Sequence, residues 1–211
     1  MALDPETGLV QRITGPLGMK DAHFFLPRDQ HDRLATVYAA LPPGLQRGTG
    51  PTVIDGQGHF VEGPRMAHAG GSGLVSTAFD YARFMQMLLN RGEFNGERLL
   101  SPATVDLMTI NHVSALFEQA VPDRPGYGFG LGFAVLLDPG KSGHYGSPGS
   151  YGFAGAYYTT YWIDPQHDVL MLLMVQLRPP RETSLHTRFR TLAYQSIVGP
   201  PPAAGDRAAV R

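Results

Sequence analysis

The sequence predicts an α/β fold of the α+β type, with helical patterns in its first half and strand patterns in its second. The clearest helix starts after Thr77, where apolar residues recur at helical spacing along 78–89. Strands are expected in 127–138, 153–164 and 169–176, which are rich in aromatic and branched residues. Because only "DPQHD" separates the last two, these strands should be antiparallel neighbours.

Local sequence patterns mark the ends of the helices. Thr77 and Asp80 are spaced as a capping box, and Gly92 supplies the expected C-cap. The "NG" of "EFNGERLL" indicates a tight turn. Serine followed by proline at 101–102 has the N-cap and first-turn chemistry of a second helix, which should run to about Ile110.

The remaining segments complete the expected organisation. Helical patterns cover 6–19 and 183–198, whereas 41–73 is rich in proline and glycine and should form a long surface loop. In 127–138, bulky residues alternate with glycine and alanine, which predicts a strand with one bare face that something packs against closely. The proline and small residues of 199–211 predict a disordered tail.

Composition limits the function. The 211 residues are 43% hydrophobic, enough for one substantial core. Seventeen Lys and Arg against 18 Asp and Glu give a net charge of -1, so neither nucleic acid nor an anionic membrane is an expected partner. The chain has no cysteine and no histidine pair at metal-binding spacing, so we expect no metal and no cofactor.

The chain also lacks the patterns of a membrane protein. Its most apolar stretch, 169–177, is the length of a buried strand and too short for a membrane-spanning helix. The N-terminal residues have no basic start and no apolar run typical of a signal peptide. We expect a soluble chain; the compartment stays open, with the cytoplasm favoured.

Four stretches carry a resemblance to a known superfamily: "PLGMKDAHF" with "RLATVY", "GGSGLVSTAFDYARFMQMLLNRGEFNGERLLSP", "YGFGLGF" and "GSYGFAGAYYTTYWIDP". They look like the C-terminal part of the serine β-lactamase and penicillin-binding-protein superfamily, nearest to the class C β-lactamase-like branch that includes carboxylesterases. The resemblance implies an antiparallel sheet flanked by helices. Residues 1–198 would be the C-terminal portion of a single β-lactamase-like domain whose N-terminal catalytic half is missing.

The resemblance also implies site residues. Such enzymes acylate a serine in S-x-x-K, use a tyrosine in a Y-x-N-like motif, and present a third motif on a sheet-edge strand. Phe153, Ala154 and Gly155 match this third motif but depart from both W-G-G and K-T-G. The missing lysine favours ester-like substrates over penicillins, and the Ala156 N–H would be an oxyanion donor. The opposite wall of the cleft would consist of Gly71, Ser72 and Gly73.

The nucleophile motif is absent from this sequence. The only lysines are Lys20 and Lys141, and three residues before them stand Leu17 and Asp138, so no S-x-x-K occurs. We therefore assign no catalytic residue. We expect the C-terminal part of a serine hydrolase for small ester or amide substrates, working through an acyl-serine intermediate and inactive until the missing segment is supplied.

Two other functions stay open. The chain could be a non-catalytic protein that uses the same fold for binding or interaction, or a self-sufficient hydrolase with Ser147 or Ser150 as nucleophile. His144 lies near both serines, but a glycine-rich loop of this kind is more often only a loop. An exposed sheet edge and apolar face further predict a chain that is partly unfolded, self-associates, or pairs with a missing N-terminal half.

Overall fold

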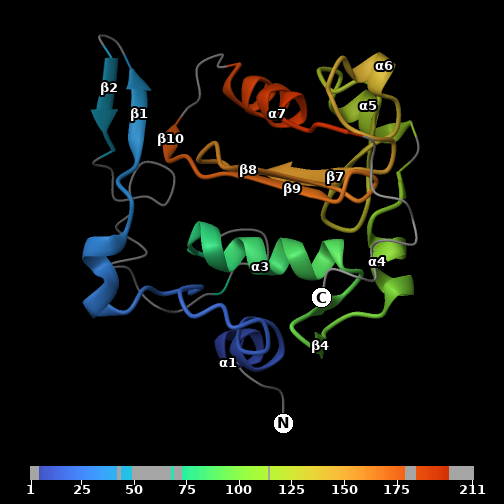
Figure 1. Cartoon of the computed structure of the whole chain (residues 1–211). Coiled ribbons are helices and arrows are strands. Elements are labelled where there is room, and N and C mark those ends of the chain that lie inside the picture. The colour runs from blue at the N-terminus through green and yellow to red at the C-terminus, as the bar shows by residue number, and fades with distance from the viewer. Residues whose placement is uncertain are drawn as a thin grey trace.

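A five-stranded antiparallel sheet with helices on both faces forms the centre of the molecule (Figure 1). The computed structural model describes residues 5–41, 44–48, 68, 73–113, 115–178 and 184–199. The strands lie in the sheet in chain order: β5 (Tyr127–Phe129), β6 (Ala134–Leu136), β7 (Tyr151–Ala154), β8 (Thr160–Asp164) and β9 (Val169–Leu173). All neighbours are antiparallel, which confirms the expected fold class.

Two helices cover opposite faces of this sheet. α3 (Ala78–Leu89) lies along one face and α7 (Leu185–Gln195) along the other (Figure 1). Because side chains alternate along a strand, Ile163 of β8 belongs to the core beneath α3, whereas Trp162 packs in a second core with Tyr194 of α7. The apolar strand β9 is thereby covered on both faces, as its uninterrupted pattern requires.

The segment 127–138 forms a hairpin, so the prediction of one continuous strand was wrong. β5 and β6 pair with each other, and the chain reverses between them through Gly132, whose φ is +97°. The bare face does have a close neighbour: a Cβ added to Gly128 would lie 2.4 Å from Cγ of Asn111. Gly132 is therefore needed for the turn and Gly128 for the close contact with Asn111. An alternating sequence pattern does not distinguish these two roles.

The segment 153–164 also divides into two strands. β7 ends at Ala154, and the chain turns back into β8 at Thr160. The turn closes through a hydrogen bond from Gly155 N–H to Thr159 O at 2.8 Å. Aromatic and branched residues continue through this turn, so strand propensity gave no sign of it. The predicted antiparallel pairing of β8 with β9 is confirmed.

Both predicted caps of α3 are present, but the C-terminal cap begins one residue before the predicted glycine. Thr77 Oγ1 accepts a hydrogen bond from Asp80 N–H at 3.2 Å. At the other end Arg91 takes a left-handed φ of +59°, and Gly92 N–H donates to Met87 O at 2.8 Å. This is a Schellman arrangement, and it places the glycine one position beyond the left-handed residue.

Shorter elements surround the sheet. Asn95 and Gly96, with φ of +52° and +83°, form the expected tight turn, and Ser101 caps the next helix by accepting from Thr104 N–H. That helix ends at Met108, two residues earlier than expected. The further elements are α1 (Pro5–Leu9) with a π-helical turn (Val10–Thr14), a 3-10 helix (Arg28–Arg33), β3 (Glu93–Phe94), β4 (Glu97–Arg98), α4 (Pro102–Met108), α5 (Leu116–Ala120) and α6 (Pro139–Ser142).

A second small sheet was not predicted. Its strands lie in the order β10 (Leu177–Arg178), β1 (Tyr38–Leu41) and β2 (Gly44–Arg47), and β10 runs parallel to β1. Part of the expected loop 41–73 thus belongs to a strand, while most of that loop and residues 200–211 of the expected tail lie outside the described residues. In the described part of the chain, no helix has the length and apolarity to cross a membrane.

Candidate active-site wall and a buried polar network

The third-motif residues lie at the end of β7 and in the turn that follows it. Phe153 and Ala154 end the strand, whereas Gly155 and Ala156 begin the turn toward β8. β7 lies between β6 and β8, so the expected sheet-edge position was wrong for the strand as a whole. However, β6 pairs only with the first two residues of β7, at 151–152. Phe153 and Ala154 therefore extend past β6 and form a local edge.

Hydrogen bonds on either side of β7 fix the direction of its backbone groups. Leu136 N–H donates to Ser150 O at 2.8 Å on the β6 side, and Gly155 N–H donates to Thr159 O at 2.8 Å on the β8 side. Because these directions alternate in an antiparallel sheet, even-numbered residues of β7 direct N–H and C=O toward β6. Ala154 thus presents its backbone to the open side, where β6 has ended.

Ala156 occupies the second position of the turn. Tyr158 N–H donates to Gly155 O at 3.0 Å, which closes a four-residue β-turn around Ala156. Ala156 is exposed, and its N–H has no hydrogen-bond partner among the residues that the structure describes. Phe153, 42% exposed, contacts the edge of Phe129 with ring centres 5.6 Å apart. The corner combines an available backbone donor with an apolar surface.

The structure describes only one of the three predicted cleft-wall residues. Gly73 has a φ of +98°, and a Cβ added there would lie 3.9 Å from the Phe24 ring. The backbones of His23 and Val75 join nearby through two hydrogen bonds of 2.9 Å. The other two predicted residues, Gly71 and Ser72, lie outside the described residues.

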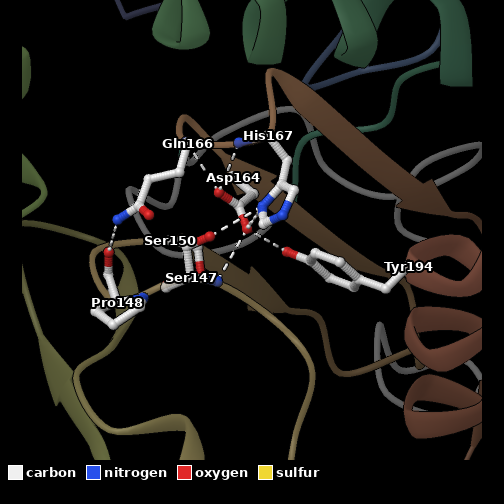
Figure 2. A network of polar contacts seen from close by, with 7 residues as sticks. All are labelled: Ser147, Pro148, Ser150, Asp164, Gln166, His167 and Tyr194. Carbon is white, nitrogen blue, oxygen red and sulfur yellow. Dashed lines mark hydrogen bonds and ion pairs between the residues drawn. The ribbon is translucent and has the colours of Figure 1, made fainter. Parts of the chain in front are cut away.

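A second polar cluster surrounds Asp164, the last residue of β8 (Figure 2). Its carboxylate is fully buried and accepts hydrogen bonds from Tyr194 Oη at 2.6 Å and from the backbone N–H of Ser147 at 3.0 Å. The N–H groups of Gln166 and His167 also donate to it, at 2.9 and 3.3 Å. Asp164 thus connects the glycine-rich loop, the β8–β9 turn and α7.

The same cluster contains a serine and a histidine, but their geometry differs from a catalytic triad. Ser147 Oγ lies 2.9 Å from His167 Nδ1, and Asp164 Oδ2 lies 3.1 Å from the same nitrogen. In a triad the serine and the carboxylate contact different ring nitrogens. One nitrogen then accepts the serine proton while the N–H of the other donates to the carboxylate. A single nitrogen cannot do both. Ser147 is also 95% buried, since only 5% of its surface is exposed.

Ser150 and His144 make other contacts. Ser150 is fully buried, and its hydroxyl donates to Ser147 O at 2.7 Å. His144 Nδ1 lies 3.0 Å from the Tyr127 hydroxyl, which also accepts from Arg190 Nη1 at 2.8 Å. The histidine that meets Ser147 is therefore His167, not the sequence neighbour. In the described part of the chain, no three His, Asp or Glu side chains gather as metal ligands.

Burial and hydrogen bonding have opposite effects on the pKa of Asp164. Burial raises the pKa of this carboxyl, but the hydrogen bonds from Tyr194, Ser147 and His167 outweigh burial, so its pKa lies below the ordinary value. Burial raises the pKa of the Tyr194 hydroxyl, and the hydrogen bond to the Asp164 carboxylate raises it further. At neutral pH Asp164 is therefore an ionised carboxylate, and Tyr194 is a phenol that donates to it.

The roles of His167, Asp164 and Tyr194 were not predicted from the sequence. A local pattern was available for two of them, because an aspartate that ends a strand and is followed by a turn commonly accepts from the N–H groups two and three residues later. Tyr194 is 30 residues from Asp164, and its contact depends on the docking of α7.

The sheet, its covering helices and the open corner at β7 are the features of a β-lactamase fold, and the chain belongs to the Beta-lactamase family, whose family model matches residues 4–195. Protein Rv1367c of Mycobacterium tuberculosis is 37% identical over 176 residues, which are 80% of this chain and 42% of that protein. Esterase EstB of Burkholderia gladioli is 26% identical over 197 residues, 82% of this chain and 48% of EstB.

A solved structure with the same fold is Simvastatin Synthase (LovD) from Aspergillus terreus. It matches with a TM-score of 0.75 and 26% identity over 93% of this chain and 51% of LovD. The chain thus spans about half the length of these relatives. It is related to serine hydrolases of the β-lactamase type and contains part of their domain.

Proposed function

We propose that this chain forms the sheet-side wall of the active-site cleft of a serine ester hydrolase. The observation that carries the proposal is the corner after β7, where Ala156 presents an exposed N–H without a described partner beside the half-exposed ring of Phe153. An N–H in such a position can stabilise the negative oxygen of a tetrahedral intermediate. The apolar ring would contact the acyl or alcohol group of the substrate.

The nucleophile must come from another segment. The sequence contains no S-x-x-K, and Ser147 and Ser150 are buried in contacts that do not activate them. We infer that the serine, its lysine and the tyrosine motif lie on a segment that completes the cleft, either in the same polypeptide or in a separate chain. The serine would attack the substrate carbonyl and expel the alcohol, and water would then release the acid.

Small esters are the favoured substrates. Phe153, Ala154 and Gly155 supply no cation that could bind a substrate carboxylate, which is the group that distinguishes penicillins from simple esters. EstB, with 26% identity, is an esterase by name. Amides remain a second class, because the same acyl-serine chemistry applies to them.

A fusion tests this proposal. The part of EstB that this chain does not match would be joined before Met1, and hydrolysis of p-nitrophenyl acetate would be measured. The control is the same fusion with the serine of its S-x-x-K changed to alanine. We expect hydrolysis by the first protein only. A fusion that folds with a single cooperative melting transition and yet is as inactive as its control would contradict the proposal.

The Ala156 donor can be removed within that fusion. Proline lacks an N–H but is favoured at the second position of a β-turn, so Ala156→Pro removes the donor with little change in the turn. We expect kcat to fall about 10²- to 10³-fold, the usual cost of one oxyanion donor. Ala156→Ser keeps the N–H and should retain kcat within a few fold. Equal activity of the two variants would exclude Ala156 as a donor.

The second candidate is a non-catalytic protein that binds a ligand or partner at the same corner. The chain's own serines favour it, because neither has the geometry of a nucleophile. Under this alternative, the completed fusion would bind a short-chain ester without hydrolysing it.

A further inference from the structure

The turn after β7 contains a strained residue. Tyr158 has a φ of +71°, in the left-handed region that glycine and asparagine occupy most readily. It is the fourth residue of the β-turn around Ala156, at the position where hairpins of this length usually have glycine. A tyrosine there carries a steric penalty that its surroundings must offset.

α7 supplies contacts that offset this strain. The ring of His186 stacks on the ring of Tyr158, with centroids 3.8 Å apart and planes inclined by 18°. His186 Nε2 also lies 2.8 Å from Tyr158 O, so the imidazole N–H donates to the carbonyl of the strained residue. One side chain of α7 therefore contacts both the ring and the backbone of Tyr158.

The C-terminal end of α7 is held by contacts that do not involve His186. Tyr194 Oη donates to the buried carboxylate of Asp164 at 2.6 Å, and its ring stacks on Tyr145. His186 and Tyr194 are eight residues apart, about 12 Å along a helix. α7 thus connects the Asp164 cluster of Figure 2 to the turn beside Ala156, across one face of the sheet (Figure 1).

We propose that Tyr158 and His186 are positioning residues for the Ala156 N–H. The stack selects the left-handed conformation of Tyr158, which sets the path of the chain from Ala156 into β8 and so the direction of the Ala156 amide. This role rests on the proposed function of Ala156 as an oxyanion donor. It assigns α7 a part in the shape of the cleft.

Amide hydrogen exchange tests the structural half of the proposal on the chain itself. The reporters are the N–H groups of Gly155 and Tyr158, whose hydrogen bonds close the turn. His186→Ala should raise both exchange rates at least 10-fold and leave the central β9 amide of Met171 unchanged. His112→Ala, which removes an exposed histidine that bonds Leu107 O, is the matched control and should change neither rate.

A second variant separates positioning from general destabilisation. Tyr158→Gly relieves the steric penalty, so the turn should no longer depend on the stack. His186→Ala should then have less than a twofold effect on the Gly155 rate in the Tyr158→Gly background. The proposal is overturned if His186→Ala leaves the wild-type turn unchanged, or if it acts equally in both backgrounds.

The catalytic half is tested in the EstB fusion. His186→Ala should lower kcat at least fivefold with little change in KM, and adding Tyr158→Gly should restore most of kcat. If exchange shows the coupling but Ala156→Pro leaves kcat intact, the stack positions the turn and the oxyanion role is wrong. If exchange shows no coupling, the positioning proposal fails whatever the fusion does.

Discussion

Asp164 shows how one buried carboxylate can organise three separate segments. Its oxygens accept from a tyrosine hydroxyl and from backbone N–H groups of the loop and the β8–β9 turn, which satisfies donors that would otherwise be buried without partners. His167 completes the cluster by sharing one ring nitrogen between Ser147 and Asp164. Because both partners contact the same ring nitrogen and Ser147 is buried, the arrangement differs from that of a catalytic triad.

Asp164→Asn should lower the free energy of unfolding by about 2 to 4 kcal/mol at pH 7, because an amide places N–H donors against the N–H groups that the carboxylate accepts. Urea denaturation measures this. The control is Asp168→Asn in the same turn: Asp168 is exposed, and asparagine tolerates its φ of +56°.

The loss of stability caused by Asp164→Asn should also depend on pH. The folded pKa of Asp164 lies below its unfolded value, so the carboxylate stabilises the fold above about pH 4 and this contribution is lost as the pH falls through the folded pKa. If the loss of unfolding free energy in Asp164→Asn stayed constant down to pH 3, the charge of Asp164 would not be the source of its stabilising effect.

His144 predicts a second pH dependence. Burial lowers its pKa, and the charges of Arg190 and Arg124 lower it further, so the unfolded chain binds a proton more readily than the folded one. Stability should therefore rise with pH up to about 6.5, the unfolded pKa. His144→Gln should reduce the loss of melting temperature between pH 7 and pH 5.

At the level of elements, β9 is the outermost strand of the five-stranded sheet and pairs only with β8 among the described residues. An edge strand presents unpaired backbone groups to any chain that can extend the sheet. We infer that β9 is where a completing segment or a second copy would add. Because a helix covers each face, further strands can add only at the sheet edges, of which β9 is one and β5 the other.

This proposal predicts self-association of the chain by itself. Sedimentation velocity over a 100-fold range of concentration should show a sedimentation coefficient that rises with concentration. A monomer at every concentration, with a sharp melting transition that does not depend on concentration, would contradict it.

Elements whose ends are set by hydrogen bonds and turns between nearby residues were predicted well from the sequence. The capping residues of α3 and α4, the Asn95–Gly96 turn and the pairing of β8 with β9 follow from interactions over a few residues. The hairpins within 127–138 and 153–164 were missed because strand-forming residues continue through their turns. At Tyr158 a distant histidine permits a conformation that local propensity opposes.

For the whole molecule, the resemblance of four stretches predicted the fold class, which the antiparallel sheet and its two covering helices confirm. The candidate site was predicted only as a set of positions. Its shape depends on where β6 ends, on a turn at Ala156 that strand-forming residues conceal, and on the docking of α7, which contacts this turn from 28 residues away in sequence. The Asp164 cluster was not predicted, because its members are brought together only by the tertiary fold.

The most direct test of the central claim is the intact mass of the purified chain after incubation with a fluorophosphonate, which phosphonylates only an activated serine. We expect an unmodified mass, because both Ser147 and Ser150 are buried, Ser147 shares its histidine nitrogen with Asp164, and Ser150 donates to a backbone carbonyl. A stoichiometric adduct on either serine would contradict it and would show a complete catalytic centre within this chain.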